Sequence, residues 1–95
     1  MKALFINITL RASWCHSLKE KRMIVKSIIS RLRNKFNISV IESENQDNHQ
    51  IIVISIAGLA ADAAQADAII ESIINFIEGN TDAEIIDIEK FREDY

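Results

Sequence analysis

The sequence contains no proline and only two glycines among its 95 residues. Because these residues punctuate turns and linkers, we expect regular structure to fill most of the chain. So few glycines also exclude a glycine-rich loop that cradles phosphates. The single cysteine, Cys15, excludes an internal disulfide and has no partner at a zinc-site spacing.

Long apolar segments are missing as well. The longest run, IIVISIAGLAA (residues 51–61), is far shorter than the ~20 residues that cross a bilayer, so we expect no membrane span. The first ten residues, MKALFINITL, are interrupted by Asn7 and Thr9 and lack a small-residue cleavage site. We therefore predict a cytoplasmic protein that folds as one domain over residues 1–95.

Charge is distributed unevenly along the chain. Residues 1–35 hold nine Lys or Arg and one acid, whereas residues 36–95 hold two Lys or Arg and thirteen acids, which together give the net charge of −3. This separation favours either an anionic partner for the first part or pairing between the two parts, within or between subunits.

Two periodicities alternate along the sequence. Residues 3–10 alternate apolar and polar side chains as a half-buried strand does, and Ser17 with Glu20 forms a capping box that opens a helix. Asp62 with Gln65 opens a second helix, and Gly79–Asn80 predicts a left-handed cap at its end. The predicted elements are a strand at 3–10, a helix from Ser17 to Asn37, strands at 38–44 and 50–57, a helix from Asp62 to Asn80, and a strand at 83–89.

This order predicts an α+β, ferredoxin-like βαββαβ fold, with a four-stranded antiparallel sheet and two helices on one face. The uncovered face is expected to carry Phe5, either Ile51 or Ile52, and either Val53 or Ile54. Since an apolar uncovered face usually marks an oligomer contact, we predict a homodimer through this open sheet face.

Residues 17–42, SLKEKRMIVKSIISRLRNKFNISVIE, resemble the YlxP-like family of small bacterial proteins, which is classed as a domain of unknown function. The match lies in Ser-Leu-Lys-Glu-Lys-Arg at the helix start, Lys-Phe-Asn at its end, and Ser-Val with Glu42 in the next strand. It extends more loosely along the rest of the chain. The resemblance implies a ferredoxin-like fold and, because family genes often lie beside translation-initiation and ribosome-maturation genes, a role near ribosomes. It implies no established catalytic residue.

The first helix carries a basic stripe on one flank, made of Lys19, Arg22, Lys26 and Arg33. The second helix carries an acidic stripe of Asp67, Glu71 and Glu78, and we expect both stripes to point away from the other helix. We predict that the basic stripe contacts phosphates of ribosomal or other structured RNA.

Two other interpretations of the basic stripe stay open at this point. Its residues could be solvated or locally paired, with Lys19 and Arg22 approaching Glu42 and Glu44. Alternatively, the chain is a protein-interaction or assembly module without nucleic-acid binding, whose basic flank meets an acidic surface such as the acidic stripe of a second copy. No aromatic pair in the strands resembles a base-stacking platform, so RNA would be read by shape and backbone.

Little else in the sequence suggests chemistry. Cys15 and His16 are adjacent, but neighbours in sequence seldom point at each other, and we predict a binding protein rather than an enzyme, with no catalytic residue and no cofactor. Glu42, Asp47, His16 and His49 match no zinc motif, so we predict no metal site. Trp14 is expected to cover an edge of the core.

Overall fold

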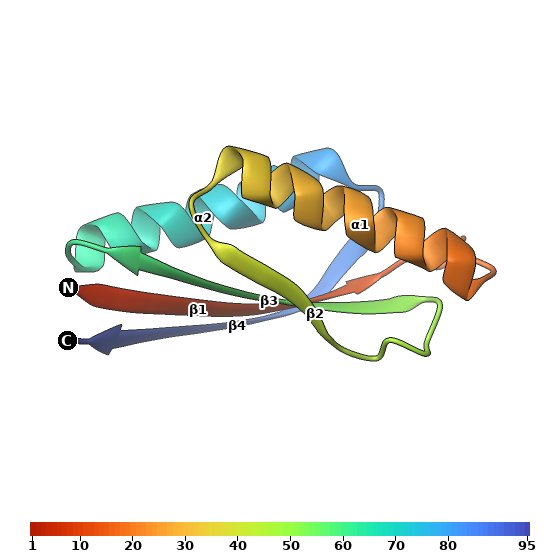
Figure 1. Ribbon diagram of the computed structural model, residues 1–95, viewed down its shortest axis with the longest axis horizontal. Helices are drawn as coiled ribbons and strands as arrows, with labels where there is room; N and C mark the ends of the chain where they lie inside the picture. The colour runs from red at the N-terminus through yellow and green to blue at the C-terminus, as the bar shows by residue number, and fades with distance from the viewer.

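The computed structural model describes residues 1–95 and has the predicted order of elements, which confirms the ferredoxin-like α+β fold. Four strands form one antiparallel sheet in the order β2-β3-β1-β4, and α1 and α2 run antiparallel to each other across the same face (Figure 1). The elements are β1 (Lys2–Arg11), α1 (Leu18–Lys35), β2 (Ser39–Glu44), β3 (Ile51–Ala60), α2 (Ala63–Asn80) and β4 (Glu84–Asp94).

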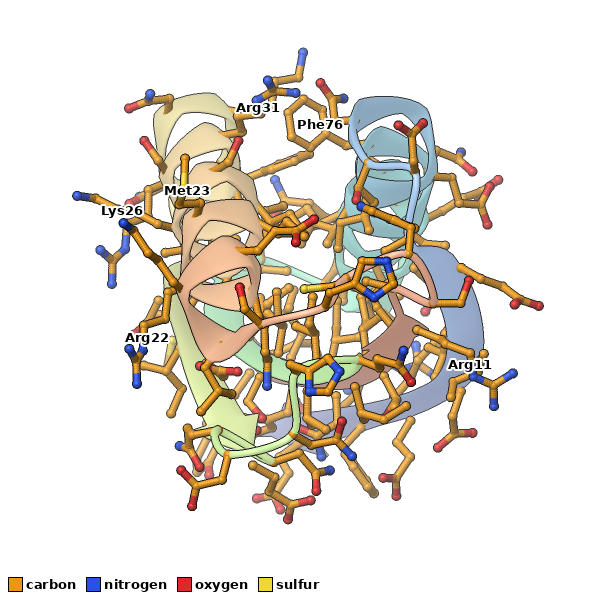
Figure 2. All side chains as sticks on the ribbon, turned by 90° about the vertical axis from the view of Figure 1, so that its right-hand side faces the viewer. Arg11, Arg22, Met23, Lys26, Arg31 and Phe76 are labelled. Carbon is orange, nitrogen blue, oxygen red and sulfur yellow. The ribbon has the colours of Figure 1, made fainter.

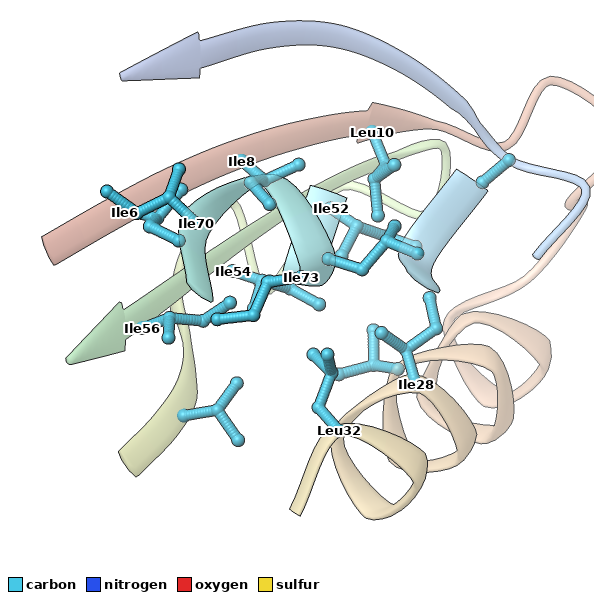
Figure 3. Packing of buried hydrophobic residues seen from close by; sticks show 14 of the residues in the cluster. Ile6, Ile8, Leu10, Ile28, Leu32, Ile52, Ile54, Ile56, Ile70 and Ile73 are labelled. Atoms are coloured by element: carbon cyan, nitrogen blue, oxygen red, sulfur yellow. The ribbon is translucent and has the colours of Figure 1, made fainter. Parts of the chain in front are cut away.

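The core lies between the sheet and the two helices (Figure 3). In β1 every second residue points into it, so Leu4, Ile6, Ile8 and Leu10 are fully buried. The β1 side chains share this core with Ile52, Ile54 and Ile56 of β3, Val25, Ile28 and Leu32 of α1, and Ala66, Ile70, Ile73 and Ile77 of α2.

Neither helix combines the length and the apolar character that a bilayer crossing requires.

Both helices begin where the capping residues predict. Ser17 Oγ accepts a hydrogen bond from Glu20 N (3.1 Å), and Glu20 Oε2 accepts one from His16 N (3.4 Å). Asp62 and Gln65 repeat the arrangement at α2, where Asp62 Oδ1 accepts from Gln65 N at 2.8 Å. Such caps satisfy backbone donors that the first helical turn leaves free, and each stabilises its helix by about 1 kcal/mol.

The predicted left-handed cap at Gly79–Asn80 is wrong. No glycine in the structure has a positive φ, and α2 continues as a regular helix through Asn80 to an extended cap at Thr81. Instead of turning the chain, the Asn80 side chain donates from Nδ2 to the carbonyl of Phe76 at 2.8 Å and so satisfies one carbonyl of the last turn.

Two strands are longer than the hydrophobic pattern indicates. β3 continues to Ala60 and β4 to Asp94, although the last residues of β4 are mostly charged. The reason is that β1 is a central strand whose backbone is paired on both sides, from Lys2 opposite Asp94 to Arg11 opposite Glu84. The backbone pairing of β1 therefore sets the length of β4 more than its own side chains do.

Replacing Gly79 by Ala should stabilise the fold, because Gly79 lies inside α2 and an added Cβ would meet no atom within 4 Å. Alanine has the higher helix propensity, so we expect the free energy of unfolding to rise by roughly 0.5–1 kcal/mol. Urea denaturation of the two proteins measures the difference. A lower stability of Gly79→Ala would contradict the helical conformation of this residue.

Candidate nucleic-acid interface

A groove of about 630 Å³ runs between α1 and the edge strand β2. It exists because no strand covers the outer side of β2, so α1 overhangs a free sheet edge. Val25 and Val40 are buried and form its apolar floor, while Ile41 is exposed at the side. The groove is lined by Arg22, Val25, Lys26, Ile29, Ser30, Arg33, Asn34, Val40, Ile41 and Glu42.

Three of the four residues of the predicted basic stripe line this groove. Arg22, Lys26 and Arg33 do so, whereas Lys19 lies outside it, exposed in the first turn of α1. Arg22 and Lys26 project from the same outer side of the helix (Figure 2). None of the four forms an ion pair with an acid, and Arg33 instead donates to the carbonyl of Val40 at 3.1 Å. The groove therefore carries positive charge that the chain itself does not neutralise.

Lys21 is a buried cation that the sequence analysis missed. Its side chain is only 2% exposed, and its Nζ lies 2.9 Å from Oε2 of Glu42 in β2. Nζ also donates to the carbonyl of Asn45 at 2.5 Å, and Asn45 has a positive φ of 57°. Asparagine tolerates this left-handed conformation better than most residues. Lys21 thus ties the first turns of α1 to β2 and to the loop that follows it.

Neither Lys19 nor Arg22 forms the expected local ion pair with Glu42 or Glu44, because Lys21 is the partner of Glu42. An irregularity in the pairing with β3 places Glu44 opposite Val53, on the sheet face away from the helices. A signal for Lys21 was present in the sequence, because positions 21, 25, 28 and 32 follow the spacing of the buried helix face. The signal was missed because lysine is normally a surface residue and is not expected on a buried helix face.

The acidic stripe is partly paired within the same chain. Asp67 Oδ1 lies 3.2 Å from Nη1 of Arg92 in β4, and Asp67, Glu71, Lys90 and Arg92 line a second groove between α2 and β4. The stripe therefore faces the only two basic residues of the second half of the chain. Glu78 lies outside this groove.

The other candidate residues are not brought together. Cys15 is buried and its Sγ donates to the carbonyl of Ser17 at 3.3 Å, while His16 is exposed. Residues 1–95 contain no group of three His, Cys, Asp or Glu side chains that could hold a metal ion. Trp14 is 41% exposed and lies beside Met23 and Asn80 at the ends of the helices.

The open sheet face is divided into an apolar end and a polar centre. At the apolar end, Phe5 and Phe91 stand opposite each other and are 39% and 49% exposed. Farther along the same face lie Ile51 and Val53 of β3, whereas Ile52 and Ile54 face the core.

In the polar centre of this face, Ser55 Oγ donates to Asn7 Oδ1 at 2.7 Å and lies 2.7 Å from Ser43 Oγ.

At the end of β4, Glu93 accepts a hydrogen bond from the Tyr95 hydroxyl and raises the pKa of Tyr95 above its ordinary value.

Lys21→Met should destabilise the protein, because it leaves the largely buried Glu42 carboxylate without its counter-charge. Breaking a buried pair from one side costs about 3 kcal/mol, whereas Lys21→Met with Glu42→Leu should regain most of that loss. Lys26→Met, at an exposed position of the same helix, is the matched control and should change the free energy of unfolding by less than about 0.5 kcal/mol. Equal urea midpoints for Lys21→Met and the native chain would show that the pair is not structural.

Comparison with known proteins agrees with the resemblance in the sequence. The family model described as "Protein of unknown function (DUF503)" matches residues 4–90. The "Uncharacterized protein YlxP" of Bacillus subtilis (strain 168) is 37% identical over 62 residues, which are 65% of this chain and 67% of that protein. Among solved structures, the "De novo designed protein Foldit4" superposes with a TM-score of 0.51 at 14% identity, over 99% of this chain and 97% of that one, and this likeness concerns the fold alone.

Proposed function

Because the chain belongs to the DUF503 family, whose function is unknown, we propose from its geometry that it is a binding protein whose α1–β2 groove contacts the phosphate backbone of structured RNA, such as ribosomal RNA. The observation that carries this proposal is the placement of Arg22, Lys26 and Arg33 along one groove without an acidic partner. Glu42, the only acid in the groove, is held by Lys21.

The distance spanned by the three groove cations suits an extended polyanion. Arg22 and Arg33 are eleven positions apart on α1, which corresponds to roughly 16 Å along the helix axis. A polyanion along this line would meet several cations in succession, and each contact would release counterions.

The charge on the rest of the chain also supports RNA binding at the α1–β2 groove. Residues 36–95 hold thirteen acids and only two basic residues, Lys90 and Arg92, and Arg92 is paired with Asp67. A polyanion is therefore repelled by most of the surface that residues 36–95 form and attracted to the basic first part of the chain. Within that part, Arg22, Lys26 and Arg33 share one groove, which favours binding there.

Reversing two groove charges, Arg22→Glu with Lys26→Glu, should weaken RNA binding by roughly tenfold for each reversed charge. The slope of log Kd against log salt should also fall by about one for each lost phosphate contact. Fluorescence anisotropy with a labelled ribosomal RNA hairpin measures both quantities. The matched control is Arg11→Glu with Lys35→Glu, which changes the net charge equally at exposed positions outside the groove.

Equal losses in the two double variants would contradict the proposal, because they would reduce binding to a net-charge effect. Circular dichroism should show that both variants remain folded, since all four side chains are exposed.

A second candidate function is self-assembly through the open sheet face, favoured by the exposed Phe5–Phe91 pair. The side chains that flank Phe91 on this face of β4 are acids, Glu89 and Glu93, which disfavour a polyanionic partner there. A second copy can cover the phenylalanines and leave these acids at the rim. This candidate is compatible with RNA binding because α1 lies on the opposite face.

Phe91→Glu should convert a dimer into a monomer, since it places a charge at the centre of the apolar end of the open face. Size-exclusion chromatography with light scattering gives the mass of each form. Lys90→Glu is the control, because its side chain points to the helix side of the sheet. A native chain that is monomeric at every accessible concentration would rule out this assembly.

A further inference from the structure

We propose that the α1–β2 groove holds one unpaired nucleobase of the bound RNA, with an N–H group of the base donating to Glu42 while the flanking phosphates contact Arg22, Lys26 and Arg33. This inference rests on the proposed function and adds to it the kind of RNA segment that the groove accepts. It would make the protein a reader of single-stranded or bulged nucleotides rather than of continuous duplex.

Glu42 is held in place by buried contacts. Its Oε2 is buried and lies 2.9 Å from Lys21 Nζ, in an ion pair without a well-aligned hydrogen bond. Lys21 is itself held by the carbonyl of Asn45. The Glu42 side chain is thus oriented by a residue that is 2% exposed, and it cannot turn freely toward solvent.

The other oxygen of the same carboxylate, Oε1, has no hydrogen-bond donor within the chain. Glu42 lines the groove and its side chain is 19% exposed, yet no group of the chain donates a hydrogen bond to Oε1. A carboxylate oxygen only accepts hydrogen bonds. The groove therefore presents one unused acceptor next to three cations.

This combination constrains the ligand. A phosphate diester has no hydrogen to donate and would be repelled by the Glu42 carboxylate, so the phosphates belong against Arg22, Lys26 and Arg33 and not against Glu42 itself. The N–H donors of a nucleic acid lie on its base edges, and in a duplex the Watson–Crick edge is already paired. An unpaired base supplies the donor that Glu42 lacks.

The shape and lining of the groove fit the flat faces of a base. Val25, Ile29, Val40 and Ile41 contribute aliphatic surface, which is suited to an apolar ring face. The volume of about 630 Å³ lies within the range of roughly 300–1,000 Å³ that small-molecule sites span. Arg22 and Arg33 also offer planar guanidinium groups on which a base can stack.

The test compares two single-stranded RNA heptamers by fluorescence anisotropy at low salt, one intact and one with abasic residues at its three central positions. Both carry the same phosphates, so their affinities differ only through the bases. For the native chain we expect the abasic heptamer to bind about tenfold more weakly, as the loss of a hydrogen bond to a charged group implies. The variant Lys21→Met with Glu42→Leu keeps all three groove cations and should reduce this ratio to roughly threefold or less.

Three results would overturn the inference. They are equal affinities of the native chain for the two heptamers, an unchanged ratio in the double variant, and a duplex of the same length binding as tightly as the intact heptamer. If the heptamers bind equally but Arg22→Glu with Lys26→Glu abolishes binding of both, the backbone-binding function stands and only the base pocket is lost. If the native chain binds no RNA, both proposals fall.

A heptamer with 2′-deoxyribose at the central positions separates the base from the sugar as the source of the donor. Affinity equal to that of the intact heptamer supports the base. A loss as large as that of the abasic heptamer would assign the contact to the 2′-hydroxyl and overturn the inference.

Discussion

The contact of Lys21 with Glu42 and Asn45 organises the surface on which the proposed function depends. It joins the first turns of α1 to β2 and to the start of the β2–β3 loop, three parts of the chain that no other side-chain ion pair connects. Because the lysine is buried, its charge is used inside the molecule, whereas Arg22 and Lys26 remain exposed on the outer side of the helix (Figure 2). The contact thus separates structural charge from charge that is free to meet a ligand.

The free edge of β2 is the second condition for the groove. In this sheet order β2 has a neighbour on one side only, and α1 lies above it (Figure 1). An uncovered strand edge invites pairing with another chain unless the fold blunts it. Here β2 is short, and Arg33 donates to the carbonyl of Val40, so one edge acceptor is already used. These features favour a ligand that enters the groove between side chains over one that extends the sheet.

Much of the fold could be predicted from the sequence because local signals agree with one another. The alternation in β1 and the capping pairs Ser17–Glu20 and Asp62–Gln65 each report a backbone conformation directly. The failures came where tertiary contacts decide. Gly79 looked like a helix terminator, but α2 passes through it, and β4 extends beyond its apolar residues because it pairs with all of β1.

The candidate site could be predicted only in part, because a local pattern shows which side chains share a helix flank but not which residues of other elements they contact. A helical wheel places Arg22, Lys26 and Arg33 on one flank, and the structure places them in one groove. The wheel places position 21 on the buried face, but lysine is normally a surface residue, and its partners lie 21 and 24 positions away in the sequence, where a wheel cannot show them. Nor could it show that Glu42 lines the same groove, since that follows from the stacking of α1 on β2.

Mapping the contact on the protein would show whether the α1–β2 groove is the RNA-binding surface. Amide resonances of the ¹⁵N-labelled chain can be followed by NMR while a structured ribosomal RNA fragment is added. If RNA binds in the groove, the perturbed resonances should cluster at residues 22–34 of α1 and 40–42 of β2. Perturbations confined to the open sheet face around Phe5 and Phe91, or an unchanged spectrum at low salt, would contradict it.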